Sequence, residues 1–271
     1  MGNLIGTGPN KLLDSSKYFI IAVDAIGNGI STSPSNSVTQ NGKDFPQFTM
    51  RDMVNSQYEL VTKVLGLDHL YAAIGGSMGS MQVLQWAVSY PDFVDKIVAY
   101  VPTPWSNSYD MLVWSTRLQI IESAQRVNMP EKDIMKSLSM LIQSIAQTPN
   151  YFVKNIPREK FDEYLKSFDR EPSKTFTSYD YASQLRAMIN LDISKNLESK
   201  EKLKDVIKAK VFMIISLQDH IVHPQPALDF AELIGAEKLV FDSECGHLVV
   251  NCEMEKCSKA IAEFLKELKR R

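Results

Sequence analysis

Short apolar runs alternate with helical patterns at the beginning of the chain and again near its C-terminus. Each run is short and continuous, which is typical of strands that are covered on both faces. An alternation of strand and helix predicts a parallel sheet with helices on both faces, and so an α/β fold class. The candidate strands are residues 18–24, 70–75, 96–101, 211–215 and 238–241.

The first helical stretches carry their own start and stop signals. Thr49 with Asp52 three residues later fits a weak capping box, and Gly66 suits the position after the helix end. The apolar stripe of this helix is expected to contain Met53, Val54, Val61, Val64 and Leu65. A second helix is predicted from about Met78 to Tyr90, where Pro91 stops it.

The middle of the chain lacks this alternation. Between residues 105 and 208, Met, Leu and Ile recur at helical spacing without a clear strand, and prolines divide the segment into short helices. We therefore predict a helical insertion at 105–208, flanked by two parts of one α/β core at 1–104 and 209–271.

Composition excludes several classes of protein. The 271 residues are 44% hydrophobic, and 30 Lys and Arg against 32 Asp and Glu give a net charge of −2. This composition suits a globular domain rather than a low-complexity chain, and the weak charge argues against a nucleic-acid partner. No apolar run approaches the ~20 residues that cross a bilayer, and the first residues lack a secretory signal. We expect a cytoplasmic protein with no membrane partner.

The three cysteines lie close together near the C-terminus. Cys245, Cys252 and Cys257, with His247, suggest either a metal cluster or reduced thiols. Zinc sites usually contain a C-x2-C pair, which is absent here, so the spacing favours free thiols and no metal.

The strongest chemical motif is Gly75-Gly76-Ser77-Met78-Gly79, which fits G-x-S-x-G. It follows a predicted strand and opens a predicted helix, as a nucleophile elbow requires. Such a turn strains the backbone of Ser77, and Gly75 and Gly79 are expected to avoid collisions. The Met78 N–H at the helix start is expected to point toward a developing oxyanion. A glycine-rich turn without catalysis is the alternative.

A serine nucleophile needs a base, and the base needs a carboxylate in the chain order Ser, Asp or Glu, His. Asp219 and His247 follow the strands at 211–215 and 238–241, where ligand-handling residues occur in an open α/β sheet. We predict that His247 is the general base and that Asp219 orients it. The other candidates are His220 or His223 as the base, Asp24 or Asp242 as the acid, and His69, which is expected at the surface.

At these motifs the chain resembles the α/β-hydrolase superfamily, in the branch that contains homoserine O-acetyltransferase. The resemblance implies an α/β-hydrolase fold, a Ser77 nucleophile, a triad completed by Asp219 and His247, and a helical lid at 105–208. It also implies a small-molecule acyl substrate, with acetyl-CoA as a candidate acyl donor and no cofactor; a homodimer is compatible with it. The residues that carry it are Leu4-Ile5-Gly6, residues 14–19, residues 75–82, Tyr90-Pro91-Asp92 and the Asp219/His247 pair.

Two departures from that branch bear on the acyl acceptor. The homoserine-specific enzymes place an aspartate after the catalytic histidine, where this chain has Leu248, and they carry a lid arginine, whereas residues 137–151 contain none. Loss of such a partner weakens recognition by ~1–3 kcal/mol. We therefore expect water as the acceptor and a small ester or thioester as the substrate, with homoserine-type acetyl transfer as the alternative.

A third departure concerns the N-terminal region. In the superfamily a central strand and the loop that supplies the second oxyanion N–H precede the segment that starts here near Leu4, and residues 1–17 offer no candidate for either. The resemblance therefore predicts that this sequence is a shortened version of a longer enzyme. A non-catalytic or decayed module is the third hypothesis.

Overall fold

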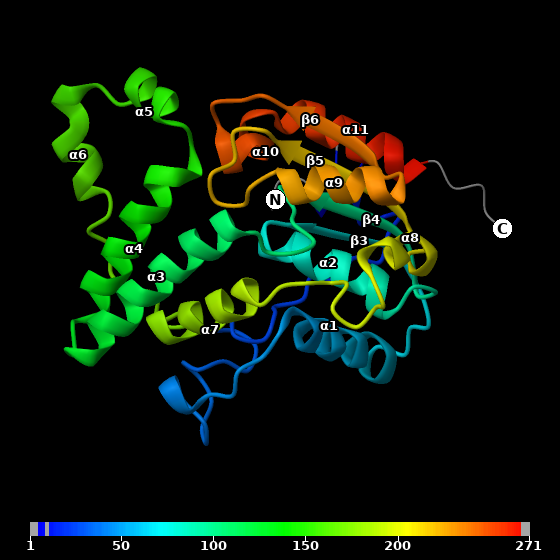
Figure 1. Cartoon of the computed structure of the whole chain (residues 1–271), viewed down its shortest axis with the longest axis horizontal. Coiled ribbons are helices and arrows are strands. Elements are labelled where there is room, and N and C mark those ends of the chain that lie inside the picture. The colour runs from blue at the N-terminus through cyan, green and yellow to red at the C-terminus, as the bar shows by residue number, and fades with distance from the viewer. Residues whose placement is uncertain (1–4, 9–10, 267–271) are drawn as a thin grey trace.

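The core is a four-stranded parallel sheet (Figure 1). The computed structural model describes residues 5–8 and 11–266. Every neighbouring pair is parallel, in the order β3-β4-β5-β6. The α/β fold class predicted from the alternation is therefore confirmed. The strands are β3 (Leu70–Gly76), β4 (Val94–Tyr100), β5 (Lys210–Ser216) and β6 (Glu237–Phe241).

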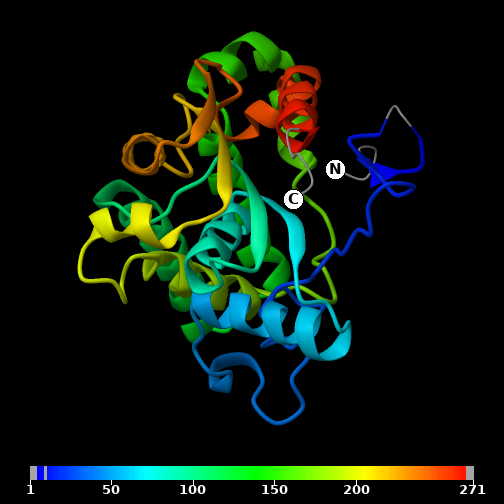
Figure 2. The same cartoon turned by 90° about the vertical axis from the view of Figure 1, so that its right-hand side faces the viewer.

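The two faces of the sheet are covered by different helices (Figure 2). Along β5, Val211, Met213 and Ile215 belong to the main core, which includes α2 (Met78–Ser89) and α9 (Gln225–Ile234). Phe212 and Ile214 alternate with them and pack against α11 (Met254–Lys266). This alternation follows from the two-residue period of a strand. The continuous apolar run in β5 thus serves two cores.

The helix before β3 begins as predicted and ends differently. Thr49 and Asp52 form a reciprocal capping box at the start of α1 (Met50–Glu59). Met53, Val54 and Val61 are buried, but Val64 and Leu65 are exposed, which corrects the predicted stripe. The reason is the π-helical turn η3 (Leu60–Val64), whose wider winding rotates the last residues off the α-helical face.

Residues 18–24 do not form the predicted strand. Among the described residues β3 is an edge strand that pairs only with β4, so residues 18–24 do not pair with it. The segment runs outside the sheet (Figure 2), and Phe19 is 79% exposed. The described N-terminal residues form only the two-residue pair β1 (Ile5–Gly6) and β2 (Leu13–Asp14). Leu4 lies outside the described residues.

The segment 105–208 is helical as expected, and α4, α5 and α6 project from the core (Figure 1). In this segment the structure describes one β-bridge, between Trp105 and Asp192, and no strand. Its first helix, α3, packs against α7 and α4. None of the helices in the described part of the chain is long and apolar enough to span a membrane. The helices of the segment are α3 (Ser108–Arg126), α4 (Glu131–Ala146), α5 (Pro149–Asn155), α6 (Phe161–Lys166), α7 (Ser178–Ile189) and α8 (Leu203–Val206), with the 3-10 turns η4 (Arg158–Lys160) and η5 (Lys200–Lys202).

Short helices elsewhere complete the chain. η2 (Gly42–Asp44) lies in the loop before α1. η6 (Gly246–Leu248) and α10 (Val249–Cys252) connect β6 to α11. His247 lies in η6, so this connection places it at the edge of the sheet where β6 ends.

Candidate active site

Ser77 lies between the end of β3 and the start of α2 in an unusual backbone conformation. Its φ is +51° and its ψ is −121°, outside the regions that L-residues ordinarily populate. The Ser77 N–H donates to the Tyr100 carbonyl, and the Ser77 carbonyl accepts from the N–H groups of Ser80 and Met81. These bonds hold a conformation that costs about 1–3 kcal/mol. Such strain at a strand-to-helix turn is the predicted elbow geometry.

Gly75 and Gly76 make room for this turn, and only Gly75 was predicted. A Cβ at Gly75 would lie 2.2 Å from the Gly79 carbonyl oxygen, so Gly75 is required as expected. A Cβ at Gly76 would lie 1.7 Å from the Tyr100 ring, a constraint that the motif alone does not reveal. A Cβ at Gly79 meets nothing within 4 Å outside its own helix, so the expectation that Gly79 avoids a collision of its own is wrong.

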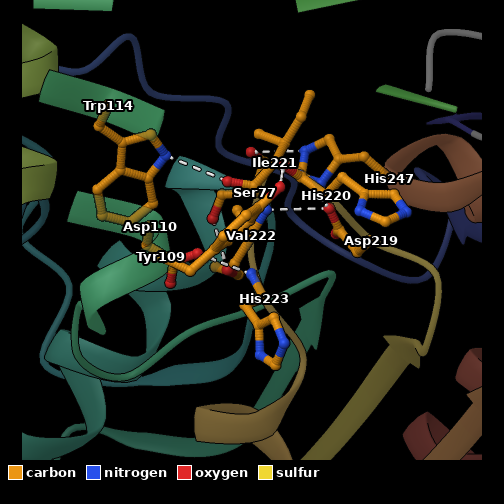
Figure 3. Close-up of polar contacts among 11 residues, drawn as sticks. Ser77, Tyr109, Asp110, Trp114, Asp219, His220, Ile221, Val222, His223 and His247 are labelled. Carbon is orange, nitrogen blue, oxygen red and sulfur yellow. Dashed lines mark hydrogen bonds and ion pairs between the residues drawn. The ribbon is translucent and has the colours of Figure 1, made fainter. Parts of the chain in front are cut away.

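A chain of two hydrogen bonds joins Ser77, His247 and Asp219 (Figure 3). The Oγ of Ser77 lies 2.9 Å from Nε2 of His247, and Nδ1 of His247 lies 2.6 Å from Oδ2 of Asp219. An ionised carboxylate only accepts hydrogen bonds, so Nδ1 carries a proton and Nε2 is free to accept the serine proton. This tautomer suits a general base.

The fold explains why these distant residues meet. Ser77 follows β3, Asp219 follows β5 and His247 follows β6, and the carboxyl ends of parallel strands meet at one edge of the sheet. The side chains of Asp219 and His247 are 2% and 10% exposed, so their contact is shielded from water. Shielding strengthens the hydrogen bond relative to an exposed one.

Met78 is the first residue of α2. The first N–H groups of a helix have no intrahelical acceptor, and the helix dipole favours negative charge there. The Met78 N–H therefore stays the predicted donor to an oxygen that becomes negative beside Ser77.

The competing histidines have other contacts. His69 is half-exposed and lies 3.1 Å from Asp95, so its predicted surface position is correct. The His220 carbonyl accepts from Tyr109, and Nδ1 of His223 accepts from the Gln225 N–H. Neither side chain contacts Ser77 in the part of the chain that the structure describes.

The competing carboxylates lie apart as well. Asp24 is exposed and accepts from the Asn28 side chain at 2.7 Å. Asp242 accepts from the Gln218 side chain at 2.8 Å. Neither carboxylate hydrogen-bonds to His247 among the described residues, so Asp219 alone of the candidate acids contacts the ring.

The cysteine prediction is wrong for two of the three residues. Cys245 and Cys252 form a disulfide, with their Cα atoms 6.6 Å apart. The short helices 246–248 and 249–252 fold the chain back within seven residues, which spacing rules for metal sites do not consider. Cys257 is free, and burial raises the pKa of its thiol to about 11. Within the described ranges no cluster of three or more His, Cys, Asp or Glu residues could hold a metal.

Sequence reasoning missed a buried carboxylate beside the site. Asp110, in the first turn of α3, is fully buried and accepts the His223 N–H at 2.8 Å. Burial raises the pKa of this carboxyl to about 7; the nearby charge of Asp219 adds to the rise, and the hydrogen bonds to Asp110 and the charge of Arg117 oppose it. The contact joins residues 113 positions apart, so no local pattern could reveal it.

One cavity lies away from these residues. It has a volume of about 540 Å³ and is lined by α4, α6 and residues 167–173, with none of Ser77, Asp219 or His247 on its walls. It therefore plays no part in the chemistry considered next.

Comparison with known proteins agrees with the geometry. The family described as "alpha/beta hydrolase fold" matches residues 8–250. A probable acyltransferase of Methanothermobacter thermautotrophicus is 30% identical over 264 residues, covering 96% of this chain and 78% of the relative. A homoserine O-acetyltransferase of Methanosalsum zhilinae is 29% identical over 299 residues, covering 96% of this chain but 59% of the relative. The solved structure of the acetyl esterase MekB superimposes with a TM-score of 0.85 at 24% identity, covering 96% of this chain and 81% of that one.

Proposed function

The chain belongs to the α/β-hydrolase fold family, in the branch that includes homoserine O-acetyltransferases, and from this premise we propose that it is a serine-dependent acyl-transfer enzyme. The observation that carries the proposal is the chain of hydrogen bonds from Ser77 through His247 to Asp219. A serine hydroxyl is a weak nucleophile until a positioned base takes its proton, and this chain supplies that base and its orienting carboxylate.

Acylation follows from the positions of the atoms. Oγ of Ser77 attacks the acyl carbonyl carbon while Nε2 of His247 takes the hydroxyl proton. Asp219 stabilises the imidazolium, and the Met78 N–H donates to the oxyanion. The bond to the leaving alcohol or thiol then breaks, His247 returns the proton to that leaving group, and the acyl group remains on Ser77.

We propose water as the second nucleophile. Water gives a proton to His247, attacks the acyl-enzyme and releases a carboxylic acid, and the proton returns to Ser77. Leu248, directly after the base, packs its apolar side chain against the main core. It therefore offers no hydrogen bond to a polar acceptor at the position where the homoserine-specific enzymes have an aspartate. This supports hydrolysis of a small ester or thioester.

Transfer to an alcohol is the second candidate. The names of the two relatives favour it, since one is a probable acyltransferase and the other a homoserine O-acetyltransferase. In this version acetyl-CoA donates the acetyl group to Ser77, and an acceptor alcohol replaces water. The helical segment 105–208 would in both versions act as the lid of the core 1–104 and 209–271. Ping-pong kinetics in which the alcohol outcompetes water would favour transfer.

Covalent labelling by a fluorophosphonate tests the proposal. We expect the wild-type chain to be labelled and Ser77→Ala to lose the label, because Oγ of Ser77 is the activated nucleophile. Ser144→Ala is the matched control, since Ser144 is an exposed serine on α4 and its loss should leave labelling unchanged. A wild-type chain that folds but takes no label would favour the non-catalytic hypothesis instead.

A further inference from the structure

The loop that carries Asp219 is held from within by Asp219 itself. Oδ1 of Asp219 accepts the N–H groups of Ile221 and Val222 at 2.8 and 2.9 Å, while Oδ2 faces His247. The orientation of Oδ2 therefore depends on where the backbone of residues 219–223 lies.

The same loop is also held from outside by the first two turns of α3 (Figure 3). Tyr109 Oη donates to the His220 carbonyl at 3.2 Å, and Trp114 Nε1 donates to the Ile221 carbonyl at 3.2 Å. Asp110 Oδ1 accepts the His223 N–H at 2.8 Å. Three side chains of one helix thus bind backbone groups of the loop.

Of the three side chains, Asp110 is held by the most hydrogen bonds. It is fully buried, and its second oxygen, Oδ2, accepts the side-chain N–H of Asn107 at 2.8 Å. Asn107 is the N-cap of α3 and accepts the Asp110 N–H at 3.0 Å. One carboxyl group therefore ties the beginning of α3 to the loop. A buried polar group with all its partners in place fixes a single geometry.

We propose that Asp110 is a positioning residue that holds the 219–223 loop, and through it Asp219, in register with His247. Asp110 hydrogen-bonds to neither Ser77 nor the His247 ring in the described structure, so it would act through the loop. The inference rests on the proposed function, and it assigns the first helix of the segment 105–208 a part in aligning the acid.

Kinetics of three variants test this role, with p-nitrophenyl acetate as the probe ester. Asp110→Ala removes the acceptor for the His223 N–H. We expect kcat to fall about 10- to 100-fold, because a small misplacement in a site of this kind can cost about 10² in rate. KM should change less than about threefold. Asp110→Asn keeps a carbonyl oxygen for that N–H but places an NH2 donor against the Asn107 side-chain N–H, so kcat should recover in part, to within about tenfold of wild type. Leu112→Ala, on the exposed side of α3, is the matched control and should match wild type.

A spectroscopic measurement separates positioning from loss of stability. The proton between Nδ1 of His247 and Asp219 is expected to give a low-field ¹H NMR resonance, because the two atoms lie 2.6 Å apart in a buried site. In Asp110→Ala this resonance should shift or broaden, and in Asp110→Asn it should stay. Where Asp110→Ala fails to fold, Tyr109→Phe decides: it removes only the hydroxyl that donates to the His220 carbonyl of the same loop, and a displaced resonance supports the proposal.

Three results would overturn the proposal. They are a folded Asp110→Ala with wild-type kcat and resonance, an Asp110→Asn as impaired as Asp110→Ala, or an unchanged resonance in Tyr109→Phe where that variant must decide. Failure of the proposed function is a separate result. If the wild-type chain hydrolyses no ester and takes no fluorophosphonate, the His247 resonance can still be compared between the wild type and the Asp110 variants.

Discussion

Asp110 is fully buried, and its carboxyl group accepts hydrogen bonds from the His223 backbone N–H and the Asn107 side-chain N–H. The desolvation of the carboxylate is the larger effect, so the pKa of this carboxyl is raised from 3.8 to about 7. The group is therefore partly neutral near neutral pH, which is the state that Asp110→Asn imitates.

The raised pKa predicts a pH-dependent stability difference between the wild type and Asp110→Asn. Because the folded state favours the neutral acid, the contribution of Asp110 to the free energy of unfolding is full below about pH 4 and falls as the pH rises to about 7. Asp219 adds to this loss and Arg117 opposes it. Urea unfolding of both proteins from pH 4 to pH 8 measures the difference. A difference that is constant across this range would contradict the assignment.

Single residues differ in how far the sequence reveals their roles. Ser77, Asp219 and His247 could be selected because each follows a strand, and a parallel sheet brings strand ends together. Asp110 could not, because its loop partner is distant in the chain and its burial depends on packing. The Cys245–Cys252 pair was missed because the short helices between them, rather than the residue spacing, bring the thiols together.

The junction of β3 and α2 is the element on which the site depends most. The chain leaves the sheet, reverses at Ser77 and enters a helix within two residues, and a backbone with positive φ at Ser77 joins the two. Gly76 lies against the Tyr100 ring on the neighbouring strand β4. The elbow is thus fixed by a contact between strands as well as by its own turn.

Substitution of two neighbouring glycines by alanine separates these effects. Gly76→Ala places a methyl group into the Tyr100 ring, and we expect it to lower the free energy of unfolding by about 1–3 kcal/mol and to slow fluorophosphonate labelling. Gly79→Ala is the matched control, because its Cβ has open space. Alanine is favoured over glycine in a helix by up to about 1 kcal/mol, so the free energy of unfolding should stay the same or rise. Denaturant unfolding and labelling rates measure both. Equal destabilisation by the two substitutions would contradict the assigned contact.

Elements are predictable where local pattern and tertiary context agree. The four strands of the sheet and helices α1, α2 and α11 have apolar patterns that match their surroundings. Residues 18–24 have the composition of a buried strand, but a strand needs a hydrogen-bonded partner, and in the described structure no strand pairs with them, although Tyr18 stacks on Tyr71 of β3. The π-turn at Leu60–Val64 likewise leaves no trace in the hydrophobic pattern, since that pattern assumes a regular α-helix.

At the scale of the whole molecule, the sheet places three distant side chains at one edge, and the segment 105–208 reaches that edge through α3 (Figures 1 and 3). Helix α4 also packs against η6, the turn that carries His247, and Thr148 and Lys154 hydrogen-bond to Glu244 just before that turn. We therefore propose that the sheet and the helical segment act as one catalytic unit, with the acyl group carried on Ser77.

Mass spectrometry of the acylated protein tests whether Ser77 carries the acyl group. The chain is mixed with p-nitrophenyl acetate, quenched in acid within the first turnover and digested, and the peptides are searched for an added acetyl group. We expect the acetyl group on Ser77, its absence in Ser77→Ala, and a strongly reduced yield in His247→Ala, because the base must take the serine proton. Ester cleavage with no acetyl group on Ser77, or with the acetyl group on another residue, would contradict this expectation.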